Sequence, residues 1–119
     1  MKLDIFCEIQ KSKPWRPDHE RTLFQETLDQ ARAADAHGFD TWWQVEHHGA
    51  LEFSYSAAPE VVLTAISQNT TRLRVGHAGV LAPFRINHPL RVAERAATLD
   101  LLSGGRFELG LAKSGGKEW

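Results

Sequence analysis

Short β-prone stretches alternate with helical ones along the whole chain, and this alternation constrains the fold more than any other feature. The β-prone stretches begin near residues 3, 40, 73 and 107, so a new strand starts about every 35 residues. Helical stretches follow the first three of them. A repeated strand-helix-strand order is typical of parallel sheets joined by right-handed helical crossovers. The sequence therefore predicts an α/β fold with the order β-α-β-α-β-α-β.

Period-two patterning or β-forming residues predict strands over 3–9 (ending near Glu8), 39–45, 73–79 and 106–111. A proline-rich loop over 11–18 leads to the first helix, with Asp18 as its N-cap and Gly38 just past its end. The second and third helices begin at Pro59 and Pro89. Helical spacing predicts three buried faces: Phe24, Leu28 and Ala31; Val61, Val62, Ala65 and Ile66; and Leu90, Ala93, Ala97 and Leu101.

Two architectures use this order, an open doubly wound sheet and a (β/α)8 barrel of roughly 250 residues or more. At about 35 residues a unit, eight units would need roughly 280 residues, and the 119 residues hold three and a half. We expect residues 1–119 to form one partial barrel domain that stops after the fourth strand. Such a chain is either part of a longer product or completes its sheet by association.

Composition excludes several classes of function. Fourteen Lys and Arg against 15 Asp and Glu give a net charge of -1, which favours neither nucleic acid nor an anionic membrane as partner. No apolar run reaches the ~18–20 residues of a membrane helix. The single cysteine, Cys7, sits in a predicted strand, and the N-terminus lacks the pattern of a signal peptide. We expect a soluble protein of the reducing cytoplasm, with Cys7 in the core.

Polar side chains cluster where the predicted strands end. Because parallel strands present their carboxyl ends on one edge, that edge should gather Glu8, Glu46-His47-His48, His77-Ala78-Gly79 and Lys113-Ser114. A carboxylate beside two imidazoles suits acid-base chemistry. Strand ends are also polar simply because they meet solvent, so position alone leaves both interpretations open.

Other chemistries have weaker support. The histidines lack the spacing of a zinc site, and neighbouring histidines on a strand point to opposite faces, so a metal-dependent hydrolase is a minor alternative. No Gly-x-Ser-x-Gly elbow is present. Ser114-Gly115-Gly116 follows a strand end, where backbone amides could cradle a phosphate with Lys113 supplying charge.

Four segments in register resemble the bacterial luciferase-like family of flavin-dependent monooxygenases. They are Val45-Glu46-His47-His48, the stretch from Val75 to Pro83 (VGHAGVLAP), the stretch from Asn87 to Glu94 (NHPLRVAE), and the stretch from Leu99 to Gly110 (LDLLSGGRFELG). The likeness covers nearly the whole chain and matches the N-terminal third of that family.

The resemblance implies a (β/α)8 barrel that binds reduced FMN, or a deazaflavin in some branches, and oxidises a small organic substrate with O2. A separate NAD(P)H-dependent reductase would supply the reduced flavin. Glu46 and His47 match the catalytic Glu-His-His motif, with His47 as the base. His77, Ala78 and Gly79 match the flavin-binding segment, which in the family holds a cis peptide bond between the last two. Lys113 and Ser114 match the loop at the flavin phosphate.

Two features of the chain depart from the family pattern. Ala112 stands where luciferase itself carries a reactive cysteine, which argues against a true luciferase. The strands that complete the phosphate site and the substrate pocket have no counterpart in the 119 residues. An inactive remnant or an association module is therefore the main alternative to an oxygenase, and we expect either a homo-oligomer or a missing C-terminal part.

Overall fold

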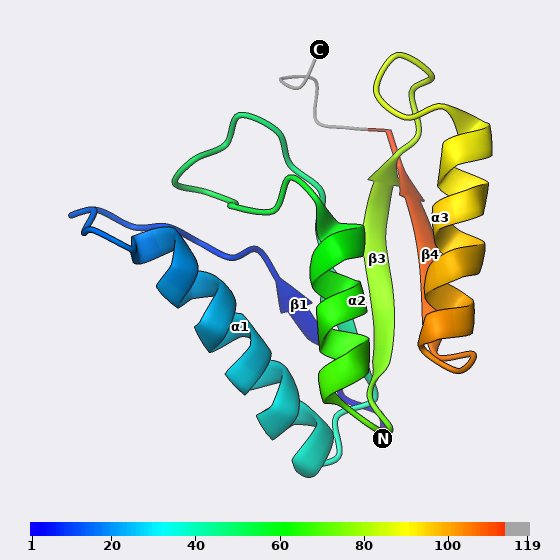
Figure 1. Ribbon diagram of the computed structural model, residues 1–119, viewed down its shortest axis with the longest axis horizontal. Helices are drawn as coiled ribbons and strands as arrows, with labels where there is room; N and C mark the ends of the chain where they lie inside the picture. Colours follow the sequence, from blue (N-terminus) through cyan, green and yellow to red (C-terminus); the bar gives the residue numbers. More distant parts are fainter. Residues whose placement is uncertain (114–119) are drawn as a thin grey trace.

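Four parallel strands form one sheet in the order β1-β2-β3-β4 in the computed structural model, which describes residues 1–113. The elements follow the predicted order: β1 (Ile5–Cys7), α1 (His19–Ala36), β2 (Thr41–Gln44), α2 (Pro59–Asn69), β3 (Arg74–Leu81), α3 (Pro89–Leu102) and β4 (Phe107–Ala112). Figure 1 shows the three helices along the same side of the sheet. Sequential strands with helices on one side are the geometry of a barrel segment, because a doubly wound sheet carries helices on both faces.

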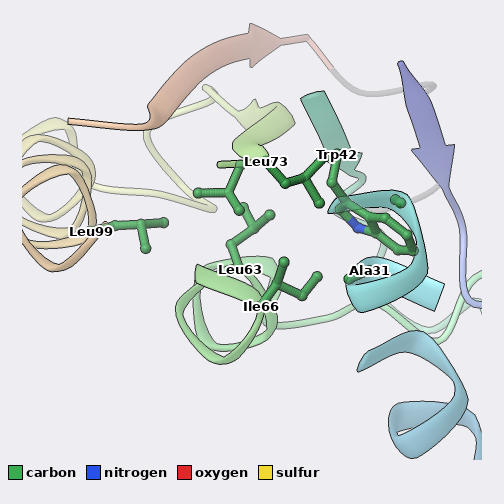
Figure 2. Packing of buried hydrophobic residues seen from close by; sticks show 8 residues of the cluster. Ala31, Trp42, Leu63, Ile66, Leu73 and Leu99 are labelled. Atoms are coloured by element: carbon green, nitrogen blue, oxygen red, sulfur yellow. The ribbon is translucent and has the colours of Figure 1, made fainter. Parts of the chain in front are cut away.

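The core lies between the sheet and the helices. Trp42 and Val75 from neighbouring strands, Leu63 and Ile66 from α2, and Leu73 are all fully buried (Figure 2). Each such side chain contributes roughly 1.5–3 kcal/mol of transfer free energy when it leaves water. This cluster fixes the sheet on α2, which contacts both β2 and β3.

The strand register sorts side chains onto two faces. Cys7, Gln44, His77 and Leu109 occupy one row across the sheet, in line with the helix-facing core residues two positions earlier on each strand. Phe6, Trp43, Gly76 and Glu108 form the neighbouring row. Since successive side chains of a strand alternate, this second row points away from the helices. Phe6 is 63% exposed there.

Helix ends agree with the sequence in position and differ in detail. Pro59 and Pro89 begin their helices as predicted, and Gly38 follows α1 with φ of 85°. Asp18 is the N-cap of α1, but its φ is 58° and its side chain makes no capping hydrogen bond. The cap that does form lies elsewhere: His88 Nδ1 accepts a hydrogen bond from the Leu90 amide, 3.2 Å away.

Two predicted features are wrong. The first strand is shorter than 3–9, because Ile9 adopts φ of 51° and turns the chain out of the sheet. The predicted face of α3 is the exposed one: Leu90 is 60% and Leu101 82% exposed, while Leu99 is buried. The helix carries a second apolar stripe at helical spacing, Val92, Ala96 and Leu99, and this stripe packs on the sheet beside β3 and β4.

On α2, Val61 also points outward, although Ile66 and Leu63 fill the core. Within residues 1–113, no helix is both long and apolar enough to cross a membrane.

Candidate active site

Glu46 lies two residues beyond β2, with its carboxylate buried. Oε2 accepts a hydrogen bond from the Leu81 amide at the end of β3, 2.9 Å away. Oε1 lies 2.9 Å from Asn87 Nδ2 and 2.9 Å from His48 Nε2. His77 Nε2 is 3.3 Å from Oε2, without the alignment of a hydrogen bond. One carboxylate therefore joins the end of β2, the end of β3 and the loop before α3.

The pKa of Glu46 is lowered from 4.5 to about 2. Burial alone would raise the pKa, because it penalises the charged form. The two nearby imidazoles of His77 and His48, the Leu81 amide and the Asn87 amide outweigh that penalty. Glu46 is consequently an anion at neutral pH, held by several donors.

Because the folded-state pKa of Glu46 lies below its ordinary value, its contribution to stability is fully present above about pH 4.5 and is lost as pH falls towards 2. The difference corresponds to about 3 kcal/mol at neutral pH. Urea unfolding of the 119-residue chain at pH 7, 5 and 3 measures it. We expect the Glu46→Gln variant to lose stability at pH 7 and to show a flatter profile between pH 5 and 3. An unchanged slope would contradict this assignment, since Asp35, whose pKa is also lowered, titrates equally in both proteins.

His47 turns away from Glu46. Its Nε2 lies 3.7 Å from Glu8 Oε2, just beyond the end of β1, and its ring meets the Phe53 ring edge-on with centroids 5.3 Å apart. The backbone amide of His47 donates to the Ser56 carbonyl, 3.0 Å away. His47 also borders a cavity of about 330 Å³ that is lined by Phe24, residues 49–51 and residues 54–58. The side chains of His47 and His48 therefore contact different carboxylates, Glu8 and Glu46, as the alternation of successive side chains predicts.

His77, Ala78 and Gly79 lie inside β3 rather than at its end, because the strand continues to Leu81. The Ala78–Gly79 peptide bond is cis, as the resemblance implies, and the β3–β4 register shifts between His77 and Val80. The His77 ring sits on the helix side, in a small crevice that α3 residues also line. From there its Nε2 lies beside the Glu46 carboxylate.

The predicted edge residues therefore form two groups. Glu46, His48 and His77 form one cluster, while Glu8 and His47 form a separate pair just past the ends of β1 and β2. Lys113 is exposed just past β4. Ser114, which was predicted to bind phosphate beside it, lies outside the described residues.

Sequence reasoning missed residues that hold the site together. Asn87 donates to Glu46 and to the Leu81 carbonyl, and it accepts from Arg95 Nη2 at 2.7 Å. Buried Gln44 donates to the Cys7 carbonyl and to Ser56 Oγ. Both are uncharged amides, so no charge pattern marks them. The only available signal was that Asn87 opens one of the four family-like segments.

Cys7 is half-buried against the core, and burial is the main reason that its thiol pKa is raised. In the part of the chain that the structure describes, no three His, Cys, Asp or Glu side chains are grouped so as to hold a metal ion.

A one-sided parallel sheet with polar side chains gathered at its carboxyl edge is the arrangement of a (β/α)8-barrel segment. The particular family follows from the sequence. The family model described as luciferase-like monooxygenase matches residues 1–118, and the chain belongs to this family.

Two relatives and one solved structure give the family its context. A luciferase-like monooxygenase of Escherichia coli K12 is 39% identical over 99 residues, which cover 82% of this chain and 28% of that protein. The oxygenase component of a flavin-dependent trigonelline monooxygenase from Acinetobacter baylyi is 28% identical, covering 95% of this chain and 30% of that protein.

The solved structure is the oxygenating constituent of 3,6-diketocamphane monooxygenase from Pseudomonas putida, a type II Baeyer–Villiger monooxygenase in complex with FMN. It superposes with a TM-score of 0.84 at 21% identity, over 96% of this chain and 30% of that one, and so shows the shared fold. The chain thus spans between 28% and 30% of the length of these proteins.

Proposed function

We propose that this chain forms the first part of a flavin-dependent monooxygenase, with His47 as the base at the flavin. The observation that carries this proposal is the pairing of His47 with Glu8, which lie just past the carboxyl ends of β2 and β1. Ligands of barrel enzymes bind at the carboxyl ends of the strands. Family membership supports the reaction class.

The two carboxylates have different roles in this proposal. Glu8 Oε2 is buried, has no hydrogen-bond partner among residues 1–113 and lies near His47 Nε2, so it can stabilise that ring when the ring carries a second proton. Glu46 was predicted to be catalytic, but both its oxygens are engaged by neighbouring donors. We assign Glu46 the task of holding the loop that carries His47.

Reduced FMN is the proposed cofactor, because one relative is named as flavin-dependent and the fold neighbour contains FMN. Reduced flavin supplies the electrons that activate O2. The backbone at Ala78–Gly79 would form part of its wall, and Lys113 would contact the phosphate. His77, on the helix side, would act through Glu46. A deazaflavin remains the alternative cofactor implied by the resemblance.

A separate NAD(P)H-dependent reductase is the proposed source of reduced flavin, since the Acinetobacter relative is named as an oxygenase component. The substrate class is a small organic molecule. We place the protein in the cytoplasm on the strength of its single cysteine.

An association module without activity of its own is the second candidate function. Within residues 1–113, β1 and β4 each pair with a single strand, so each leaves one open edge, and Phe6 of β1 is largely exposed. Open edges and exposed apolar surface are sites at which another chain or segment docks. A homo-oligomer in sedimentation analysis, combined with no flavin binding, would favour this function.

Anaerobic titration of the 119-residue chain with reduced FMN, followed by flavin fluorescence, distinguishes the two candidates. We expect micromolar binding that is about tenfold weaker for riboflavin, because riboflavin lacks the phosphate that Lys113 would attract. In the Lys113→Gln variant the two ligands should bind alike. Absence of binding at high micromolar flavin would exclude a flavin site built by this chain alone, and tighter binding of a deazaflavin would identify that cofactor instead.

A further inference from the structure

The loop between β1 and α1, residues 8–18, contains a lysine whose side chain is buried. Lys11 is 5% exposed, its Nζ lies 4.4 Å from the centroid of the Trp15 ring and 5.4 Å from that of Tyr55, and it contacts Glu20 Oε1. Lysine is almost never buried unless it is paired, because its charge loses hydration. Here two aromatic faces and a carboxylate replace the water, and Lys11 lowers the pKa of Glu20 by hydrogen bonding.

The same lysine sits where this first loop runs beside the second one, residues 49–57. The Lys11 amide donates to the Glu52 carbonyl at 3.0 Å, and the Tyr55 amide donates to the Ile9 carbonyl at 2.9 Å. The contact between the Lys11 ammonium and the Tyr55 ring adds a side-chain link, because Lys11 belongs to the first loop and Tyr55 to the second. Backbone and side chains therefore join the two loops around Lys11, and the loops also meet through the Ser54 hydroxyl, which donates to the Glu8 carbonyl at 2.8 Å, and an exposed Lys13–Glu52 ion pair.

These two loops carry two of the groups that contact the His47 ring. Glu8 comes from the first loop and lies 3.7 Å from Nε2; Phe53 comes from the second, with its ring centroid 5.3 Å from that of the imidazole. Neither residue lies in a helix or strand. Their positions consequently depend on what ties the loops together.

We propose that Lys11, Trp15, Glu20 and Tyr55, which we call the Lys11 clasp, position Glu8 and Phe53 against His47. Lys11 is thus a positioning residue rather than a catalytic one. The relevance of Lys11 to catalysis rests on the proposed role of His47. The proposed effect of Lys11 on the geometry of the loops does not depend on that role. The cation is the essential part of the clasp, because a neutral side chain would contact the two rings without being drawn to their faces.

Two-dimensional NMR of the flavin-free 119-residue chain tests the clasp. In the wild type we expect nuclear Overhauser contacts between the His47 and Phe53 rings. The Lys11→Met variant keeps the apolar stem and loses the charge, so these contacts should be lost while the methyl resonances of Leu63 and Ile66 in the core stay unchanged. Lys11→Arg restores a cation and should recover the contacts at least in part.

Lys13 provides a matched control in the same loop. Its side chain is 65% exposed and pairs with Glu52, and its Nζ lies 5.3 Å from the Trp15 ring. Lys13→Met should leave the His47 resonances unchanged. If Lys11→Met fails to fold, Trp15→Leu, at a ring that is 45% exposed, removes one wall of the clasp and should give the same loss.

The clasp is overturned if the ring contacts are absent from the wild type, if they survive in a folded Lys11→Met chain, or if Lys13→Met removes them equally. Because no flavin is present in these measurements, a failed FMN titration leaves this result intact. The two proposals can therefore fail separately.

Discussion

Replacing His47 with glutamine is expected to lower the rate of substrate oxygenation by about 10²–10⁴-fold, the usual loss when a general base is removed. Glutamine places an amide near the position of Nε2 but cannot accept a proton there. The affinity for reduced FMN should change little, because the variant keeps the loop and its backbone bond to Ser56. Oxygen consumption by the flavin-loaded protein, with a reductase and a panel of small organic substrates, measures the rate.

The matched control is His37→Gln. His37 follows α1 and is exposed, and its Nδ1 lies 2.7 Å from the Ala33 carbonyl oxygen near the end of that helix. It lies at the amino-terminal edge of the sheet, before β2, so its loss should leave the rate unchanged. A His47→Gln rate within tenfold of the wild type would remove His47 from the role of base.

Gly110→Ala is expected to destabilise the chain by about 3 kcal/mol or more, the upper part of the range for overpacking. A Cβ at Gly110 would lie 2.7 Å from the His77 carbonyl oxygen, a backbone atom that cannot move without its strand. The strain would fall where the β3–β4 register shifts, in the same strand whose Leu81 amide binds Glu46. Urea unfolding of the variant and the wild type measures the loss.

Leu109→Ala is the control in the same strand. Leu109 is 46% exposed, so we expect its loss to cost less than about 1 kcal/mol. If Gly110→Ala were as stable as the wild type, β3 and β4 could move apart to accommodate the added Cβ at little cost in free energy, which would contradict this prediction.

The order of elements could be predicted from local pattern, because β-formers, Pro59, Pro89 and Gly38 act within a few residues of themselves. Which side of α3 is buried could not, because two apolar stripes share that helix and only the sheet distinguishes them. Leu101 and Leu99 are equally apolar in the sequence. Packing beside β3 and β4 decides between them.

The site shows the same limit. Convergence of Glu8, Glu46 and His47 on one edge follows from parallel strands alone. The separation of His47 from His48 follows from alternation, but the buried placement of His77 depends on a strand that continues past it to Leu81. Lys11 could not be identified, since a lysine in a proline-rich loop is ordinarily solvated, and only the folded chain brings Tyr55 to its ammonium.

The hydrogen bonds of Glu46 also bear on the kinetics of folding. Its bonds to the Leu81 amide and to Asn87 span 35 and 41 residues, so they form only after the whole segment of β2, α2 and β3 has closed on itself. Closing loops of that length lowers the conformational entropy of the chain before the new contacts can stabilise it. This entropy loss slows folding. The carboxyl edge of the sheet is therefore expected to form late in folding, after α2 has docked, and Glu46 variants should speed unfolding far more than they slow folding.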